Sequence, residues 1–133
     1  MDILIASHGT LAQGVQSAVN IIVGDNDTTI INAYVDESNF KEVLKEYFAN
    51  HDEVCVLTDL FGGSVNQEIM QYMKGKNIHV ITGVNLSLAL EIILANKNDV
   101  LTEEKIMQII EVARQQILYI NKELENQVMD DFD

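Results

Sequence analysis

The stretch that decides the fold is Ile3-Leu4-Ile5-Ala6-Ser7-His8-Gly9, a short apolar run that ends in serine, histidine and glycine. Its length and its β-branched side chains predict a buried strand of a parallel sheet. In open parallel sheets, ligands bind at the carboxyl ends of the strands. The sequence therefore predicts that His8 lies at the edge of a sheet where α/β proteins carry out their chemistry.

Strands and helices are predicted to alternate along the rest of the chain. Apolar side chains recur at helical spacing in residues 10–23, and the apolar run at 54–58 is typical of a central strand. Residues 28–35 are more polar, which favours a place near a sheet edge. The alternation predicts an α/β domain with a parallel sheet between layers of helices. Further elements are expected as a strand at 78–82 and helices after Ser38, from Ser64 to Gly75, after Asn85, and from Thr102 to Ile117.

Three of these helices begin with capping signals. Ser38 and Thr102 are predicted N-caps, and Glu103 lies where the positive end of a helix dipole favours negative charge. Ser64 and Gln67 fit a capping box, in which the serine is the N-cap and the glutamine is the third helical residue.

The composition limits the classes of function. The chain has 133 residues, a formal net charge of −13 and 47% hydrophobic residues. This charge argues against nucleic acid and anionic membrane surfaces as partners, because both attract basic proteins. No segment has the length and apolarity of a membrane span and no basic signal region begins the chain, so a cytoplasmic protein is expected. The single Cys55 lies in an apolar run and is expected to be a buried thiol.

A carboxylate and a glycine-rich loop are predicted to share the edge with His8. Asp59 directly follows the central strand, and Gly62, Gly63 and Ser64 follow at the start of a helix. Each of these residues has an ordinary structural explanation by itself, in a turn or as a helix cap. Together they suit phosphoryl transfer through histidine, because a helix N-terminus and glycines favour a phosphate and a carboxylate fixes the tautomer of the ring. Since the carboxylate also favours the protonated ring, its expected role is mainly orientation.

The other histidines are predicted to lie at the opposite edge. His51 precedes a strand and His79 lies near the start of another, so a strand length of roughly 16 Å separates them from His8. A zinc site built from the three histidines is therefore rejected. The chain has neither a Walker loop nor a Gly-x-Gly-x-x-Gly fingerprint, so no nucleotide cofactor is expected.

Three blocks of sequence resemble a known family, the IIA components of the mannose class (EIIA-Man) of the bacterial phosphoenolpyruvate-dependent sugar phosphotransferase system. The resemblance covers residues 1–120 and leaves 121–133 as an acidic C-terminal tail. It implies a three-layer αβα fold, a four-stranded sheet of order 2-1-3-4 and a homodimer. The blocks, which match in order and separation, are Ile5-Ala6-Ser7-His8-Gly9, Thr58-Asp59-Leu60-Phe61-Gly62-Gly63-Ser64 and Thr82-Gly83-Val84-Asn85-Leu86.

The resemblance also implies a function and roles for individual residues. His8 is expected to take a phosphoryl group from the phosphohistidine of HPr and to pass it to a IIB component, which phosphorylates a sugar during uptake. The membrane components IIC and IID are implied as indirect partners. In the family, the aspartate that matches Asp59 bonds the active histidine, and the serine that matches Ser64 helps to hold the phosphoryl group.

The chain departs from the family pattern just after Ser64. The family usually has a proline where this chain has Val65, and an asparagine where it has Gln67. Asn66 stands one place earlier than that asparagine, so the resemblance assigns no role to Asn66 or Gln67.

Three alternative functions are considered beside that of a phosphocarrier in sugar transport. A phosphorylation-dependent sensor would use His8 in the same way, and a demonstrated IIB acceptor would separate the two. A receiver domain phosphorylated on Asp59 needs acidic residues after the first strand to hold magnesium, where this chain has Ser7-His8-Gly9. A hydrolase with a serine–histidine pair is disfavoured, because neighbours in a strand point to opposite faces.

Overall fold

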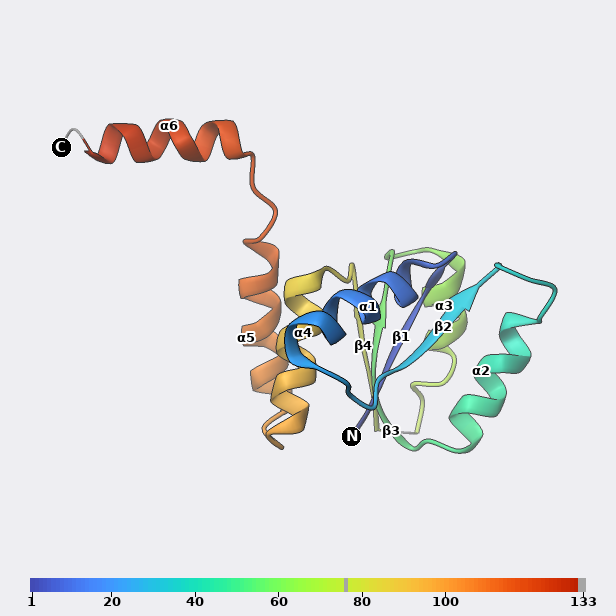
Figure 1. Ribbon diagram of the computed structural model, residues 1–133. Coiled ribbons are helices and arrows are strands. Elements are labelled where there is room, and N and C mark those ends of the chain that lie inside the picture. Colours follow the sequence, from blue (N-terminus) through green and yellow to red (C-terminus); the bar gives the residue numbers. More distant parts are fainter. Residues whose placement is uncertain (76, 132–133) are drawn as a thin grey trace.

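The computed structural model describes residues 1–75 and 77–131 and has an α/β fold built on a four-stranded sheet (Figure 1). The strands are β1 (Asp2–His8), β2 (Thr29–Ala33), β3 (Glu53–Thr58) and β4 (Asn77–Thr82). All neighbours pair in parallel, in the order β2-β1-β3-β4. This confirms the predicted fold class and strand order, with the more polar β2 at an edge and β3 inside.

Helices cover both faces of the sheet (Figure 1). They are α1 (Leu11–Val23), α2 (Phe40–Ala49), α3 (Ser64–Met70), α4 (Leu86–Lys97), α5 (Glu103–Arg114) and α6 (Ile120–Asp131). α1 and α4 pack on one face and α5 packs against α4, whereas α2 and α3 cover the other face. α6 extends away from the rest of the molecule (Figure 1).

The two central strands bury side chains on both faces, which explains their unbroken apolar runs. In β1, Ile3 and Ile5 belong to the core under α1 and α4, while Leu4 and Ala6 belong to the core under α2 and α3. Full burial of a side chain such as Leu4 stabilises the fold by about 1.5–3 kcal/mol. Cys55 is fully buried in β3, which confirms the expected buried thiol, and burial raises the pKa of this thiol to about 12.

The N-termini of α2 and α5 lie outside the candidate site, and their N-caps can be compared with the predicted ones. The Thr102 hydroxyl accepts a hydrogen bond from the Lys105 backbone N–H at 3.1 Å, as predicted. The prediction for α2 was wrong, because the N-cap is Asn39, whose side chain accepts from the Lys41 N–H at 2.9 Å. Ser38 bonds the Asp36 carboxylate instead and so belongs to the preceding turn.

Three element boundaries also differ from prediction. β2 is shorter than residues 28–35 because the chain leaves the sheet at Tyr34, and α3 ends at Met70 rather than near Gly75. The last helix was predicted to reach Ile117, but α5 ends at Arg114 and α6 forms a separate helix. The division of the chain at residue 120 stays a prediction, and the tail residues 132–133 lie outside the described residues.

The helices are short and mostly amphipathic. Within residues 1–75 and 77–131, no helix combines the length and the apolarity needed to cross a membrane.

Candidate active site

His8 is the last residue of β1, and its neighbours explain how it reaches the surface. Gly9 has a φ of +59°, a left-handed conformation that glycine adopts readily and that turns the chain from β1 toward α1. Ser7 is fully buried, and its hydroxyl accepts a hydrogen bond from the Ala12 backbone N–H at 2.7 Å, at the start of α1. Because successive strand residues point to opposite faces, the His8 ring lies on the α3 side of the sheet.

Asp59 holds the His8 ring through one carboxylate oxygen. Oδ2 of Asp59 accepts a hydrogen bond from the His8 backbone N–H at 2.8 Å and lies 2.8 Å from Nδ1 of the ring. The carboxylate side chain is 7% exposed, whereas the imidazole is 40% exposed. An ionised carboxylate accepts hydrogen bonds only, so Nδ1 carries the proton and Nε2 carries the free lone pair.

The pKa of Asp59 reflects this position beside the ring. Burial acts to raise the pKa of the carboxyl group. The hydrogen bonds that Asp59 accepts from the backbone and the ring of His8 act in the opposite direction, and the pKa of Asp59 lies below its ordinary value of 3.8. The carboxyl group is therefore ionised at neutral pH, as its role beside Nδ1 requires.

The glycines after Asp59 allow the loop to pass close to the ring. Gly62 has a φ of +79°, which favours glycine, and the amide of Gln67 donates to its carbonyl oxygen at 3.2 Å. A Cβ atom added to Gly63 would lie 3.3 Å from Cε1 of His8, tighter than an ordinary contact. Glycine is therefore favoured at both positions, at Gly62 by the backbone conformation and at Gly63 by the close approach to His8.

Ser64 faces the second ring nitrogen of His8. Its Oγ atom lies 3.3 Å from Nε2. The predicted capping box was wrong, because Gly63 occupies the N-cap position and Ser64 is the first residue of α3. Its hydroxyl makes no capping bond to the helix, which leaves it directed at the imidazole.

Tyr34 also reaches the site, although it was not among the predicted site residues. It follows β2 with a φ of +65°, a left-handed conformation that costs a non-glycine residue about 1–2 kcal/mol. Its ring centroid lies 5.5 Å from that of His8, and its hydroxyl donates to Oγ of Ser64 at 3.0 Å. The signal that could have found it is topological, because Tyr34 follows the strand that neighbours β1 in the sheet.

Val65 and Asn66, at the departure from the family pattern, have structural roles. Val65 is fully buried in the core between the sheet and α3. The side chain of Asn66 is 3% exposed and accepts a hydrogen bond from the hydroxyl of Thr58 at 2.9 Å. This bond ties α3 to the end of β3, the strand that leads into Asp59.

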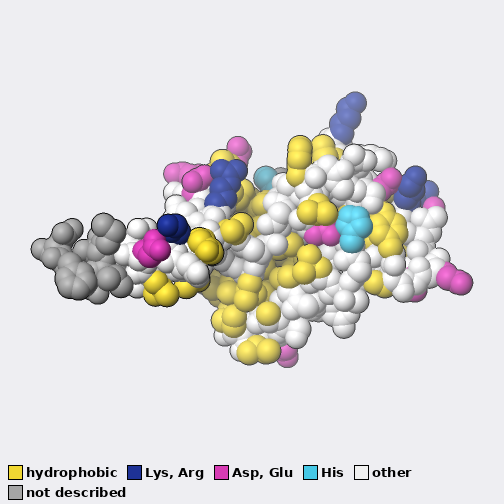
Figure 2. Space-filling model, turned by 90° about the horizontal axis from the view of Figure 1, so that it is seen from above, with side chains coloured by type: hydrophobic (Ala, Val, Ile, Leu, Met, Phe, Trp, Pro, Cys, Tyr) yellow, Lys and Arg dark blue, Asp and Glu magenta, His cyan; other side chains and the backbone are white. Residues whose placement is uncertain are grey.

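The surface around the ring is open and partly apolar. Leu60 and Phe61, in the loop after Asp59, are 60% and 84% exposed, and Leu11 at the start of α1 is 49% exposed. Figure 2 views this edge of the sheet from above, with hydrophobic side chains exposed around a histidine. An exposed surface of this kind suits contact with another protein rather than enclosure of a small molecule.

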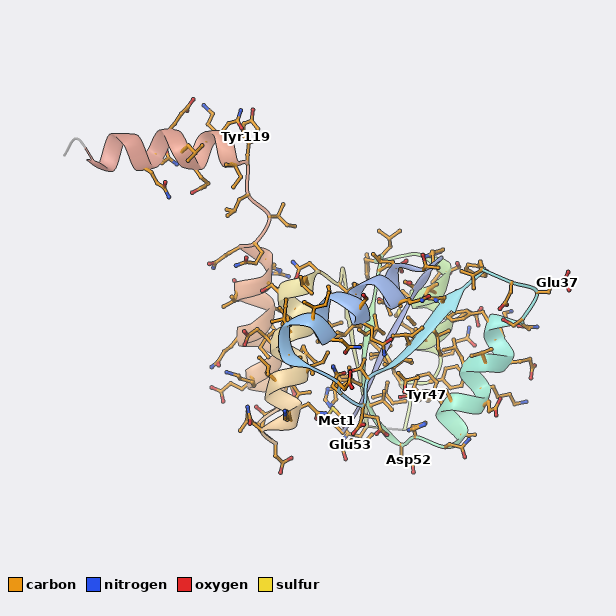
Figure 3. All side chains as sticks on the ribbon, in the orientation of Figure 1. Met1, Glu37, Tyr47, Asp52, Glu53 and Tyr119 are labelled. Carbon is orange, nitrogen blue, oxygen red and sulfur yellow. The ribbon has the colours of Figure 1, made fainter. Side chains whose placement is uncertain are left out.

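The other two histidines lie at the amino-terminal edge of the sheet, as predicted. His51 contacts the Asp2 carboxylate at 2.8 Å, and His79 lies near the start of β4. Figure 3 labels Met1 at this edge, at the opposite end of the strands from the His8 site. Among the described residues, no group of three or more His, Cys, Asp or Glu side chains is arranged to hold a metal ion.

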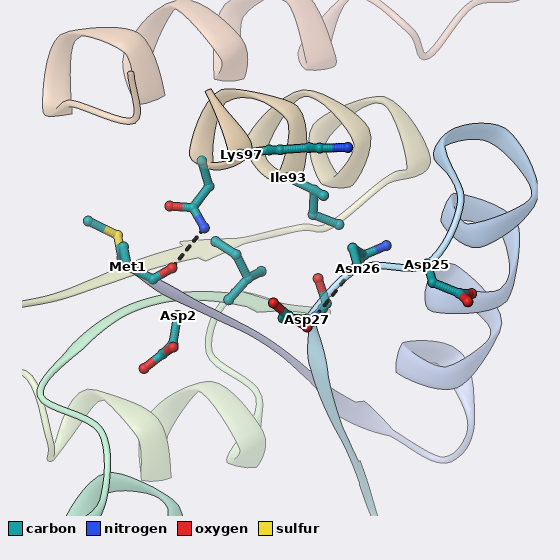
Figure 4. Close-up of a pocket in the computed structure, with 10 residues that line it drawn as sticks. Met1, Asp2, Asp25, Asn26, Asp27, Ile93 and Lys97 are labelled. Carbon is teal, nitrogen blue, oxygen red and sulfur yellow. Dashed lines mark hydrogen bonds between the residues drawn. The ribbon is translucent and has the colours of Figure 1, made fainter. Parts of the chain in front are cut away.

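A cavity of about 310 Å³ also lies at the amino-terminal edge (Figure 4). It is lined by the start of β1, the loop before β2 and the end of α4, including Asp2, Asp27 and Lys97. It is therefore separate from the candidate site, which lies at the other end of β1.

Comparison with known proteins identifies the family of this chain. Residues 2–111 match the family model EIIA-man, described as PTS system fructose IIA component. The match spans most of the chain, so the protein belongs to this family. Family membership gives it a role in phosphotransfer within a sugar phosphotransferase system.

Solved structures agree with this assignment. A protein from Klebsiella pneumoniae described as a phosphoenolpyruvate-dependent sugar phosphotransferase system permease is 30% identical, with a TM-score of 0.85 over 92% of this chain and 93% of that one. Component EIIA from Streptococcus agalactiae is 25% identical, with a TM-score of 0.75 over 91% and 98%. The mannose/sorbose specific IIA subunit from Enterococcus faecalis is 22% identical and shares the fold, with a TM-score of 0.72 over 89% and 92%.

Proposed function

We propose that His8 is the phosphoryl carrier of a sugar phosphotransferase system, which accepts the group from phospho-HPr and passes it to a IIB component. The observation that carries the proposal is the pairing of Nδ1 with Asp59, which leaves Nε2 exposed beside Ser64. In the first transfer the P–N bond of the donor histidine breaks and a P–N bond to Nε2 forms. In the second transfer the Nε2–P bond breaks as a bond forms between the phosphorus atom and the acceptor side chain of IIB.

Asp59 favours both the free and the phosphorylated ring. Before transfer it fixes the tautomer in which Nε2 carries the lone pair. After transfer, the ring bears a phosphoryl group on Nε2 and a proton on Nδ1, and is therefore an imidazolium. The adjacent carboxylate stabilises this positive charge through a charge-assisted hydrogen bond.

Ser64 and the glycine loop are the proposed contacts of the phosphoryl group. The Ser64 hydroxyl lies near Nε2, where it can donate to a phosphoryl oxygen. Gly63 allows the backbone to approach the ring closely, so no side chain competes with the incoming group at that point.

The partners of the proposed carrier are other proteins. The exposed Leu60 and Phe61 beside His8 support docking of HPr and IIB at this edge. The family resemblance further supports a homodimer, a cytoplasmic location and indirect coupling to the membrane components IIC and IID.

Labelling with purified components tests the proposed function. Incubation with phosphoenolpyruvate, enzyme I and HPr is expected to place one phosphoryl group on the chain, and peptide mapping at alkaline pH is expected to locate it on His8. Addition of a IIB component should then discharge the label. A label on Asp59 would instead support a receiver domain, and a stable label in the presence of IIB would contradict a transport role.

A further inference from the structure

We infer that Tyr34 is a positioning residue for phosphoryl transfer, acting through the hydroxyl group of Ser64; this inference rests on the function proposed above. The side chains of Tyr34, Ser64 and His8 are connected by two successive polar contacts. The Tyr34 hydroxyl donates to Oγ of Ser64 at 3.0 Å, and that oxygen lies 3.3 Å from Nε2 of His8.

The hydrogen-bonding capacity of a hydroxyl explains how Tyr34 can set the direction of the Ser64 hydroxyl proton. A serine hydroxyl has one proton to donate and two lone pairs that accept. Donation from Tyr34 occupies a lone pair of Ser64 and leaves the serine proton directed toward Nε2. When Nε2 takes the phosphoryl group, the same proton is available to a phosphoryl oxygen. Tyr34 therefore selects the orientation of the Ser64 hydroxyl that both states of His8 use.

The placement of Tyr34 is not explained by burial. Its side chain is 58% exposed, so water could satisfy its hydroxyl in many other orientations. Its backbone nevertheless adopts a left-handed conformation, with a φ of +65°. Unfavourable backbone conformations of this kind occur preferentially at functional sites, where the surrounding structure maintains them.

Neighbouring rings hold the phenol in place. The Tyr34 ring contacts two other rings, that of His8 at a centroid distance of 5.5 Å and that of Phe40 at 5.9 Å. Phe40 is 6% exposed at the start of α2, so it provides a fixed surface for the tyrosine. The phenol is thus oriented before any donor arrives, with its ring tilted by 43° against the imidazole.

A double-mutant cycle tests the inference. Transfer rates from phospho-HPr are measured for the wild type, Tyr34→Phe, Ser64→Ala and the double variant. Tyr34→Phe is expected to lower kcat about three- to tenfold, the equivalent of one hydrogen bond, with KM for phospho-HPr unchanged. In the Ser64→Ala background the same change is expected to have no effect, because the two residues act as one unit.

Two further variants keep the test specific. Tyr119→Phe, at the residue directly before α6, makes the same chemical change away from the site and is expected to transfer at the wild-type rate (Figure 3). Tyr34→Asn introduces a residue that tolerates the left-handed backbone conformation. This variant therefore tests the role of Tyr34 if Tyr34→Phe folds poorly. It is expected to lose at least as much activity as Tyr34→Phe.

The outcomes separate this inference from the proposed function. If wild-type protein is labelled on His8 and Tyr34→Phe transfers as fast as Tyr119→Phe, the role of Tyr34 is overturned while the carrier function stands. Equal losses from Tyr34→Phe in the wild-type and Ser64→Ala backgrounds would also overturn it, because Tyr34 would then act independently of Ser64. Wild-type protein that takes no label on His8 would overturn the proposed function itself.

Discussion

His8→Ala is expected to abolish phosphorylation by phospho-HPr while leaving the fold intact. The variant lacks the nucleophilic Nε2 atom, so the phosphoryl group has no acceptor at the site. The loss of the ring contact to Asp59 is expected to cost about 1 kcal/mol of folding stability, because the His8 backbone N–H still bonds the carboxylate. Radiolabel incorporation and thermal unfolding measure the two effects separately.

His51→Ala provides the matched control for this prediction. His51 also pairs with an aspartate at 2.8 Å, but it lies at the opposite edge of the sheet. Its replacement is expected to leave labelling at the wild-type level. Label retained on His8→Ala, or lost from a folded His51→Ala, would contradict the assignment of His8 as the acceptor.

Asp59→Ala is expected to slow phosphoryl transfer about 100-fold, without removing the acceptor. Without the carboxylate, the ring loses the partner that fixes its orientation and places the proton on Nδ1. The phosphorylated imidazolium also loses the neighbouring negative charge. Single-turnover kinetics with phospho-HPr measure the change, and Asp52→Ala, at an exposed site before β3, serves as the control.

Asp59→Asn separates orientation from charge. The amide oxygen retains the capacity to accept a hydrogen bond, while the negative charge is lost. If orientation is the main role, this variant should transfer faster than Asp59→Ala. Transfer at the wild-type rate in Asp59→Ala would show that the carboxylate does not orient the ring.

The lowered pKa of Asp59 also predicts how stability depends on pH. A carboxyl group whose pKa is lower in the folded protein stabilises the fold above its unfolded pKa, here the ordinary value of 3.8. That contribution is lost as the pH falls through the lower folded value. Denaturant unfolding at a series of acidic pH values is therefore expected to show a smaller decline for Asp59→Ala than for the wild type.

The central part of the site could be predicted because it follows from strand order and burial. The apolar runs in β1 and β3 identify two buried parallel strands, and residues after such strands share one edge of the sheet. From this rule we predicted that His8 and Asp59 lie close together, and the two side chains are in contact in the structure. The same rule predicted that His51 and His79 lie at the opposite edge of the sheet, and the structure has both residues there.

The remaining features depended on the exact residue at which an element begins or ends. A shift of one position made Ser64 the first residue of α3 instead of its cap, which changed the direction of its hydroxyl. Likewise, the polar composition of residues 28–35 indicated an edge strand but did not reveal that the chain leaves the sheet at Tyr34. Local propensity does not fix such boundaries, because packing against the rest of the fold decides them.

The identity of the phosphorylated nitrogen tests the central claim most directly. Protein labelled with ¹⁵N on histidine is phosphorylated through HPr, and NMR spectra then identify the ring nitrogen bonded to phosphorus. Because Asp59 occupies Nδ1 and Nε2 faces Ser64, the phosphoryl group is expected on Nε2 of His8. A phosphoryl group on Nδ1 would contradict the account, since the contact with Asp59 would have to break before transfer.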